Sequence, residues 1–488
     1  MSTWQTIWEF IKEWYWIPLL LLYADIIITI ISENRNPSKS LAYILVLIFL
    51  PVAGLVIYYF VGRKPVFKKI VFKKKRRVDE QKTQQYYRRL APQMEERLQL
   101  LEQNIGDMSF PFRYLYYQNQ SLISTGNAVT LLNNGEEKFP ALFKALENAR
   151  SHIHIEYYIF TADDVGNHIA DILLKKHSEG IEVRVIVDDV GSNRFKKIQK
   201  RLKKAGIPVL KTMPVAFSSL ANSNYRNHRK IVVIDGVIGF IGGINLDERY
   251  WNNGKHKLYW HDTAVQIEGK AVNLLQVQFF LSWFFSGGKD DFREDDYYFT
   301  TAEKKGNAII AIAASGPSSP IPYVMETILL AISQARKSIR ICTPYFIPNE
   351  QLTSALVIAA ANGVEVELIL PEKSDSFIVQ HASFSFIKPL LQRGVRIYLY
   401  ERGFIHAKTI SIDNSLAFVG TVNMDTRSFF LNFEITSVIY ETGLCQALEQ
   451  NFAKDKQSSH LVTLEYWQSR TVIQRGFDSV CRLVAPLL

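Results

Sequence analysis

The sequence predicts an α/β protein built from two duplicated α/β/α domains with pseudo-twofold symmetry, preceded by a two-helix transmembrane hairpin. Three observations lead to this prediction. A motif of histidine, lysine and aspartate occurs twice, the same order of helices and strands accompanies each copy, and two long apolar stretches lie near the amino terminus. Repeated surroundings around a repeated motif indicate duplicated domains.

The two apolar stretches have the length of membrane-spanning helices. Residues 15–31 include Asp25 as their only charged residue, and residues 41–61 contain no charge. At 1.5 Å per helical residue, each crosses a hydrocarbon core of about 30 Å, the first only just. A short polar segment joins them, so residues 1–62 are predicted to form a transmembrane hairpin.

A basic segment follows the second apolar stretch. Residues 63–77 hold nine Lys or Arg and no acid, so the formal charge of +10 falls to about +1 for the rest of the chain. Charge confined to one segment favours contact with an anionic membrane surface over nucleic-acid binding. The positive-inside rule then places the rest of the chain, beyond the two apolar stretches, in the cytoplasm. Residues 63–105 are assigned to this basic juxtamembrane segment and a polar helical linker.

Three widely spaced cysteines, Cys342, Cys445 and Cys481, lack metal-ligand spacing. They argue against a disulfide framework and against a zinc site, and are interpreted as reduced thiols.

The remaining chain divides into two similar parts, predicted as domains at residues 106–300 and 301–488. Each part contains, in order, a helix, a strand, a second helix, a glycine turn at Gly180 or Gly363, and a strand rich in Val and Ile. This order is typical of a βαβ unit and predicts a buried, largely parallel sheet. The aromatic stretches 279–285 and 381–387 are interpreted as core faces of helices, with the apolar lining of an entrance as the alternative.

The duplicated motif carries the chemistry. It is His-x-Lys, four residues, then Asp, and each copy is followed by a Gly-x-x-Asn segment at the same distance; the histidines and the asparagines are both 178 residues apart. Composition predicts only about 0.04 chance matches to the His-Lys-Asp pattern. The residues are His228, Lys230, Asp235 and Asn245 in the first copy, and His406, Lys408, Asp413 and Asn423 in the second.

These residue types suit phosphoryl chemistry. A neutral imidazole is a nucleophile toward phosphorus, and a second imidazole can give and take a proton near neutral pH. Lysine donates to phosphate oxygens, and the motif aspartate, closing the strand, can orient a histidine. Alternation along each strand places the histidine and lysine on one face, so two strands meeting across a pseudo-twofold axis would converge on one phosphate. No metal is expected, because the two lysines would repel a cation.

Further stretches specify a family. They include ENRNPSKSLAYILVLIFLP, VDDVGS, NHRKIVVIDG, FIGGINL, TPYFIP, GFIHAK and GTVNMDTRSFFLNFE. With the paired motifs, the chain resembles the phospholipase D superfamily and, within it, the bacterial cardiolipin synthases. The resemblance extends over nearly the whole length, including the predicted hairpin.

The resemblance implies transfer of a phosphatidyl group without a cofactor. Two phosphatidylglycerol molecules would give cardiolipin and glycerol through a phosphatidyl-histidine, at the bacterial cell membrane. His228 is preferred as the nucleophile and His406 as the acid–base group, and near symmetry leaves the reverse assignment open. The lysines and asparagines of the motifs would hold the phosphoryl oxygens.

The resemblance also implies that Asp262 and Glu434 orient the histidines. Where relatives often read Trp-Arg-Asp, this chain has Trp260, His261 and Asp262. The alternatives are a phospholipase D-type hydrolase, a phosphatidylserine synthase-like transferase, and a membrane-anchored polyanion-binding protein with a dead site. Intact His, Lys and Asp in both motifs speak against the last. The oligomeric state is not specified by the sequence.

Overall fold

The computed structural model describes residues 14, 16–32, 37–58, 94–118, 121–214, 224–288, 297–299 and 304–485. The chain divides into two compact units. The smaller comprises residues 1–68 with 217–224, and the larger comprises residues 69–216 and 225–488.

The described residues of the smaller unit form the helices α2 (Trp16–Ser32), α3 (Pro37–Phe49) and α4 (Pro51–Ile57). Among the described residues, no helix is both long enough and apolar enough to span a membrane. The second apolar stretch is divided at Pro51, because proline has no N–H for the helix hydrogen bond and its ring crowds the preceding turn. Ile30, Leu47 and Tyr58 form the small core of this unit. The predicted transmembrane hairpin is therefore not confirmed.

The larger unit begins with helical segments. The predicted basic segment 63–77 lies outside the described residues, whereas the linker ends in α6 (Met94–Ile105), as predicted. The 3₁₀ turn η3 (Gly106–Ser109) and α7 (Phe110–Tyr117) follow. Leu98, Phe112 and Leu115 pack these helices into the main hydrophobic core.

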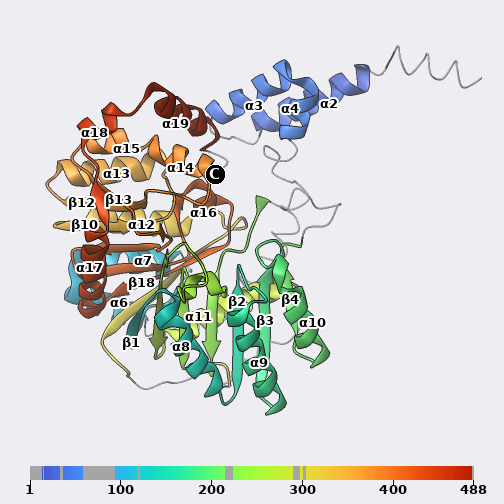
Figure 1. The fold of residues 1–488 in the computed structure, drawn as a ribbon, viewed down its shortest axis with the longest axis vertical. Coiled ribbons are helices and arrows are strands. Elements are labelled where there is room, and N and C mark those ends of the chain that lie inside the picture. The colour runs from blue at the N-terminus through green and yellow to red at the C-terminus, as the bar shows by residue number, and fades with distance from the viewer. Residues whose placement is uncertain are drawn as a thin grey trace, which may run out of the picture. The chain divides into compact units, whose positions relative to one another are not determined.

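A 15-stranded sheet runs through the larger unit (Figure 1), in the order β19-β13-β12-β10-β15-β16-β18-β9-β1-β8-β6-β5-β2-β3-β4. From the β1–β9 junction outward, the order in one half repeats in the other, with β19 added at one edge. The predicted duplication is therefore present as one continuous sheet with a pseudo-twofold axis at its centre.

The first half contains these elements: β1 (Ser124–Asn133), α8 (Asn134–Glu147), β2 (His152–Tyr157), α9 (Asp164–Ser178), β3 (Glu182–Asp188), η4 (Asn193–Phe195), α10 (Lys196–Lys204), β4 (Val209–Thr212), β5 (Lys230–Ile234), β6 (Ile238–Gly242), η6 (Glu248–Trp251), β7 (Trp260–His261), β8 (Thr263–Glu268) and α11 (Val272–Phe285).

The second half contains these: β9 (Ala308–Ser315), α12 (Tyr323–Gln334), β10 (Ser338–Cys342), β11 (Phe346–Ile347), α13 (Glu350–Ala361), β12 (Glu365–Pro371), α14 (Phe377–Phe384), α15 (Ile387–Leu391), β13 (Arg396–Tyr400), β14 (Phe404–Ile405), β15 (Thr409–Ile412), β16 (Leu416–Gly420), β17 (Met424–Asp425), α16 (Thr426–Phe430), β18 (Glu434–Tyr440), α17 (Thr442–Gln457), β19 (Ser459–Leu461), α18 (Leu464–Ser469) and α19 (Val472–Val484).

The prediction of a largely parallel sheet was wrong for the central strands. The outer pairs β2–β3, β3–β4, β10–β12 and β12–β13 are parallel, as the helix crossovers require. The hairpins β5–β6 and β15–β16 are antiparallel, and so are the central pairs β1–β9, which joins the two halves, and β18–β9. The predicted turns Gly180 and Gly363 both have φ of 88°, a conformation that glycine adopts without strain.

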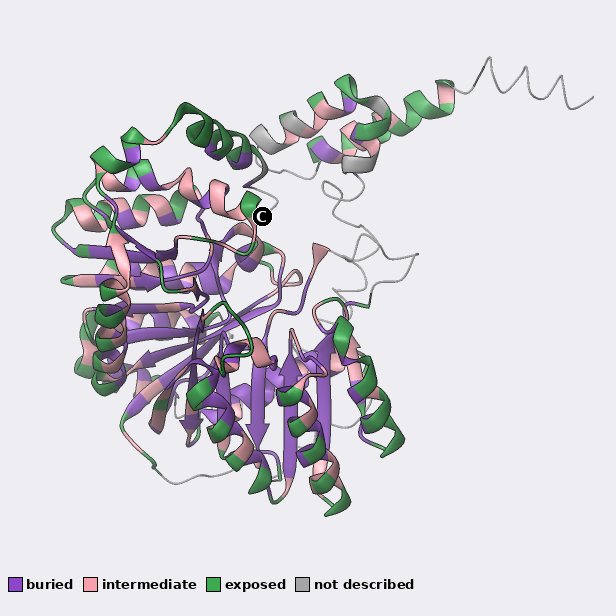
Figure 2. Cartoon of the chain, viewed as in Figure 1, coloured by how far each residue is buried: buried purple, intermediate pink, exposed green. Residues whose placement is uncertain are grey.

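Most strands of the sheet are buried on both faces (Figure 2), and helices cover them. The aromatic stretch in α11 belongs to the core, as preferred from the sequence, because Phe279, Phe280 and Trp283 are buried in one cluster. Asn127 ties the two halves together. Its amide donates to the carbonyls of Ser124 and Ala308, so a buried side chain links β1 to β9.

Candidate active site

Both motif histidines line one cavity of about 340 Å³ in the larger unit. His228 comes just before β5 in the first half, and His406 follows β14 in the second. The motif asparagines Asn245 and Asn423 line the same cavity. The sequence-predicted convergence of the two motifs therefore exists in the fold.

Each histidine is bound by a buried carboxylate from the opposite half. His228 Nδ1 lies 3.0 Å from Glu434 Oε2, at the start of β18. His406 Nδ1 lies 2.6 Å from Asp262 Oδ2, just before β8. Both carboxylates are fully buried. The contacts cross the pseudo-twofold axis, so neither half contains a complete histidine–carboxylate pair of its own.

Short parallel bridges bring these pairs together. The backbone N–H of His228 donates to the carbonyl of Phe433 at 2.9 Å, next to Glu434. In the equivalent place, the N–H of His406 donates to the carbonyl of His261 at 2.6 Å, next to Asp262. β14 pairs in parallel with β7 here. The backbone thus sets the distance between each ring and its carboxylate.

The carboxylates decide which nitrogen of each ring is available. With Nδ1–H donating to a carboxylate, Nε2 keeps its lone pair, the arrangement that a nucleophile or base requires. Burial, aided by the nearby Lys408 and opposed by Asp262, lowers the pKa of His406 to about 3. Burial also lowers the pKa of His228, aided by Lys230 and opposed by Glu434. Both rings are therefore neutral near neutral pH.

Positive charge opposes the cost of burying the carboxylates. Burial raises the pKa of Asp262, but Lys408 and His406 outweigh it, and the net pKa is lowered. For Glu434, burial likewise raises the pKa, and His228 with Lys230 lowers it below its ordinary value. Both groups are thus carboxylates near neutral pH, as acceptors for Nδ1–H must be.

In both halves, the motif lysine donates to the backbone carbonyl of the histidine of the same motif. Lys230 Nζ donates to the carbonyl of His228 at 2.8 Å, and Lys408 Nζ donates to the carbonyl of His406. Burial lowers the pKa of Lys230 to about 7 and also lowers the pKa of Lys408. An anionic phosphate would favour their charged forms, because opposite charge stabilises an ammonium.

The asparagines differ between the halves. Asn245 Nδ2 donates to the hydroxyl of Tyr250 at 2.7 Å, and its Oδ1 accepts from the backbone of Ile159. Asn423 is buried, and its Oδ1 has no hydrogen-bond partner among the described residues. A buried amide oxygen without a donor is costly, and a substrate hydroxyl in the cavity would satisfy it.

The motif aspartates do not orient the histidines, which corrects that expectation for Asp235 and Asp413. They lie at the far ends of β5 and β15, where Asp235 and Asp413 have φ of 55° and 52° in hairpin turns. Asp235 accepts from the backbone N–H groups of residues 150–152 at 2.7–3.0 Å. Asp413 accepts from those of residues 336–338 at 2.7–2.8 Å. Each therefore ties its hairpin to the start of the neighbouring strand, β2 or β10.

Several residues of the site were not predicted. Tyr250 lines the cavity and places its hydroxyl 3.4 Å from His406 Nδ1. Thr421 donates to Glu434, whereas the equivalent Gly243 lies so close to Asp262 that a Cβ there would meet its Oδ1 at 2.1 Å. Lys138 is buried, and burial lowers its pKa to about 7. Tyr250 and Lys138 stand outside the repeated motifs, so spacing gave no signal for them, and Gly243 and Thr421 occupy the variable position of the Gly-x-x-Asn segments, where the residue types differ between the copies.

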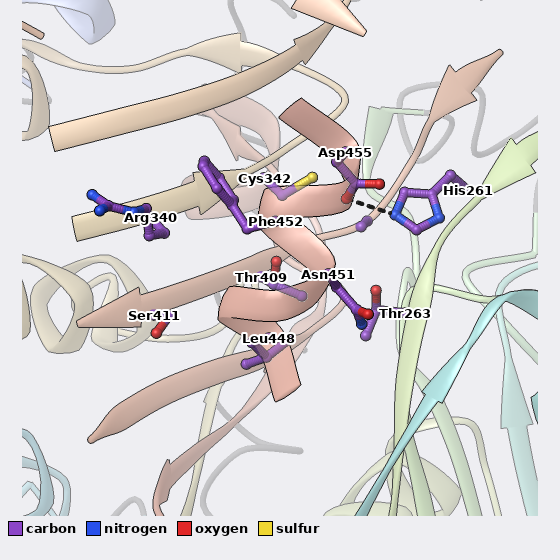
Figure 3. Close-up of a pocket in the computed structure, with 11 residues that line it drawn as sticks. His261, Thr263, Arg340, Cys342, Thr409, Ser411, Leu448, Asn451, Phe452 and Asp455 are labelled. Carbon is purple, nitrogen blue, oxygen red and sulfur yellow. Dashed lines mark hydrogen bonds and ion pairs between the residues drawn. The ribbon is translucent and has the colours of Figure 1, made fainter. Parts of the chain in front are cut away.

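A second, smaller cavity of about 20 Å³ lies under α17 (Figure 3). His261 contributes to its wall, with Nε2 2.9 Å from Asp455 Oδ2. His261 Nδ1 lies 2.9 Å from Asn134 Oδ1, which also accepts from the N–H of Asp262. The histidine in place of the Trp-Arg-Asp arginine thus connects α17 to the Asp262 backbone.

Among the described residues, one set of potential metal ligands brings its atoms within 4.8 Å of one another: Glu372, Glu401 and His460. These residues lie beside the outer strands β12, β13 and β19, and none lines the histidine cavity. They are exposed or half-buried, as surface acidic groups commonly are.

Comparisons with known proteins agree with this site. The family model described as "Cardiolipin synthase, PLD-like domain" matches residues 142–280 and 328–456. The cardiolipin synthase of Oceanobacillus iheyensis is 38% identical over 470 residues, which cover 94% of this chain and 95% of that protein. The cardiolipin synthase of Alkalihalophilus pseudofirmus is 36% identical over 463 residues, covering 94% and 91%. The chain belongs to the cardiolipin synthase family of the phospholipase D superfamily.

Two further comparisons concern the amino-terminal segment and the fold. The family model described as "Phospholipase_D-nuclease N-terminal" matches residues 14–63. The solved phosphatidylserine synthase of Haemophilus influenzae Rd KW20 has a TM-score of 0.58 at 15% identity, over 74% of this chain and 95% of that chain. At that identity, the likeness concerns the fold alone.

Proposed function

We propose that the protein is a membrane-bound phosphatidyltransferase that converts two phosphatidylglycerol molecules to cardiolipin and glycerol. The observation that carries the proposal is the pair of imidazoles in one cavity, each held at Nδ1 by a carboxylate of the opposite half. The relatives named cardiolipin synthase, matched over most of the chain, support a phospholipid substrate. The hydrolase and phosphatidylserine synthase-like alternatives have no such support.

In the first step, one Nε2 attacks the phosphorus of phosphatidylglycerol. The anionic substrate phosphate raises the pKa of the other imidazole, which is neutral in the empty site, so that this ring takes up a second proton at Nε2. The bond from phosphorus to the headgroup glycerol then breaks, and the Nε2 proton passes to the departing alkoxide. Lys230 and Lys408 balance the charge of the phosphoryl oxygens, with Asn245 and Asn423 as further contacts. The product of this step is a phosphatidyl-histidine and free glycerol.

In the second step, a second phosphatidylglycerol donates its headgroup hydroxyl. The imidazole that lost its proton takes the hydroxyl proton, the oxygen attacks phosphorus, and the phosphorus–nitrogen bond breaks to release cardiolipin. Asp262 and Glu434 stabilise whichever ring is charged. We assign His228 as the nucleophile and His406 as the acid–base group, in keeping with the sequence.

The test of the function uses purified full-length protein in detergent with phosphatidylglycerol and no divalent metal. Cardiolipin and glycerol should appear in equal amounts. Phosphatidic acid as the only lipid product would replace the proposal with hydrolysis.

The assignment of the two histidines has its own test. His406→Asn should abolish turnover and leave a phosphatidyl group on His228, detected by intact-protein mass spectrometry after incubation with substrate. His228→Asn is the matched control and should abolish turnover without a trapped group. Trapping in the His228 variant alone would reverse the assignment.

We also propose that residues 15–31 and 41–61 anchor the protein as a multi-pass hairpin, with domains 106–300 and 301–488 on the cytoplasmic side. The match of residues 14–63 to an amino-terminal family segment supports an anchor, as do the exposed apolar side chains Leu20, Leu21 and Ile28 of α2. The basic segment 63–77 supports contact with anionic lipid. A cysteine placed at Ser38 should react with a membrane-impermeant maleimide from outside intact cells, and one placed at Val237 should not.

A further inference from the structure

We propose that α19, together with the start of α14, is a membrane-docking surface that seats the catalytic cavity on the anionic leaflet. It rests on the proposed function in one respect, namely that the substrate is a membrane lipid. The occupant is a bilayer surface rather than a second protein.

The helix α19 exposes its apolar face. At about 100° per residue, its large apolar side chains fall within roughly 140° of one another. They are Val472, Ile473, Phe477, Val480 and Leu483, which are 75%, 72%, 46%, 63% and 79% exposed. Figure 2 shows α19 largely in the colour of exposed residues. An ordinary surface helix turns such a face toward the core.

The other face of α19 is fastened to the protein through polar contacts. Asp478 is buried and accepts from Arg470 at 2.7 Å, and its other oxygen lies 2.7 Å from His381 Nδ1 of α14. Arg482 lies over the ring of Phe386, 4.8 Å from its centroid. These contacts fix the orientation of the helix, so the outward direction of the apolar face is built into the packing.

The apolar surface continues to the catalytic cavity. The ring of Phe477 meets that of Phe377 edge-on, with centroids 5.6 Å apart, and Phe377 and Ile378 are themselves 57% and 47% exposed. Val379, the next residue of α14, lines the cavity beside both histidines. The exposed apolar side chains of α19 and of the start of α14 therefore lead to the wall of the cavity that holds the histidines.

Charge favours an anionic lipid as the occupant. The exposed charged side chains on α19 are those of Arg475 and Arg482, since the carboxylate of Asp478 is buried against Arg470. Helices with an apolar face and basic residues bind in the headgroup region of anionic membranes. Contiguous exposed apolar surface on a folded protein marks an interaction site.

The first experiment locates α19 in the full-length protein reconstituted into vesicles of phosphatidylglycerol and phosphatidylcholine. Val480→Cys carries an environment-sensitive fluorophore, and nitroxide-labelled lipids serve as quenchers. Val237→Cys, in the β5–β6 turn, is the matched control, and the unsubstituted chain gives the background from its buried cysteines. We expect at least twofold quenching at position 480 and none at 237; equal quenching at the two positions would overturn the proposal.

The second experiment measures activity. Ile473→Glu with Val480→Glu should lower turnover of phosphatidylglycerol in bilayers by about tenfold and leave turnover of monomeric short-chain phosphatidylglycerol unchanged, with Val237→Glu as control. Wild-type turnover by the double variant on bilayers would refute the docking role. Crosslinking between two copies at position 480 without lipid quenching would assign the face to a dimer instead. If the wild-type chain makes no cardiolipin from either substrate, the proposed function fails, while the quenching still reports independently on α19.

Discussion

At the scale of single residues, Asp262 and Glu434 each have two roles, one in orienting a histidine and one in balancing its charge. Each holds Nδ1 of a histidine across the pseudo-twofold axis, and each supplies the negative charge that an imidazolium would need during proton transfer. Their burial makes the contact rigid, because water does not compete for the carboxylate oxygens.

We expect Asp262→Asn to lower kcat about a thousandfold with a small change in KM, because an amide no longer fixes the proton on Nδ1 of His406. Glu434→Gln should act similarly through His228. Steady-state kinetics with phosphatidylglycerol measure both. The exposed Asp171→Asn is the control, and activity within threefold of wild type in the Asp262 variant would contradict the orienting role.

The lowered histidine pKa values predict the pH profile. A neutral nucleophile is lost as pH falls through its pKa, and in the free enzyme the pKa of each histidine lies below the ordinary value of about 6.5. The acid limb of kcat/KM should therefore fall below pH 6.5. A limb at or above that pH would show that the free-enzyme histidines are not held neutral.

His261 is expected to act as a positioning residue. His261→Ala removes the contacts to Asn134 and Asp455, so Asp262 and His406 lose a backbone support. We expect kcat to fall about tenfold at constant KM, and His261→Arg to restore it by pairing with Asp455. An equal loss in both variants would point to a purely steric effect.

At the scale of elements, the β5–β6 and β15–β16 hairpins explain the aspartates of the motif. Asp235→Ala leaves three backbone N–H groups without their acceptor, so the free energy of unfolding should fall by about 2 kcal/mol. Denaturant titration measures this, and turnover per folded molecule should stay near wild type. The exposed Asp171→Ala should change stability by less than about 0.5 kcal/mol. A loss of activity without a loss of stability would return Asp235 to the active site.

The sequence predicted the helix and strand order of these elements well, because glycine turns and Val/Ile-rich strands recur in both halves. It failed on strand direction, because the prediction followed the βαβ units of the outer strands and did not use the turns at Asp235-Gly236 and Asp413-Asn414, which are too short for a parallel crossover. The short parallel pairings β7–β14 and Asn227–Phe433 could not be predicted from the sequence, because they join residues far apart in the chain.

At the scale of the whole molecule, the sequence predicted that the two motifs meet in one site. It did not predict that each histidine binds a carboxylate of the opposite half. Repetition indicates that two histidines meet, but only the folded sheet determines that Glu434 faces His228 and Asp262 faces His406. The orientation of α19 was equally hidden, because an apolar stripe in a sequence ordinarily indicates a buried face.

Acid should destabilise the whole larger unit through two buried histidines. Burial lowers the pKa of His152 to about 3 and also lowers that of His154, whereas both titrate near 6.5 when unfolded. The unfolded chain therefore binds more protons below pH 6.5, and stability falls as pH decreases, by roughly 1 kcal/mol per pH unit for each histidine. Unfolding free energies at pH 7 and pH 5 measure this. His152→Gln with His154→Gln should flatten the dependence and the exposed His168→Gln should not; an unchanged slope in the double variant would contradict the prediction.

The crossed carboxylates also bear on how such a site can specialise. In a dimer of identical half-chains, symmetry would make the two histidines the same group in the same surroundings. In a single chain that carries both halves, the surroundings of the two histidines can differ. They already differ at one pair of equivalent positions, because Thr421 lies beside Glu434 whereas Gly243 lies beside Asp262. The fusion of two half-sites therefore permits a division of labour between attack and proton transfer that no symmetric pair could encode in its sequence.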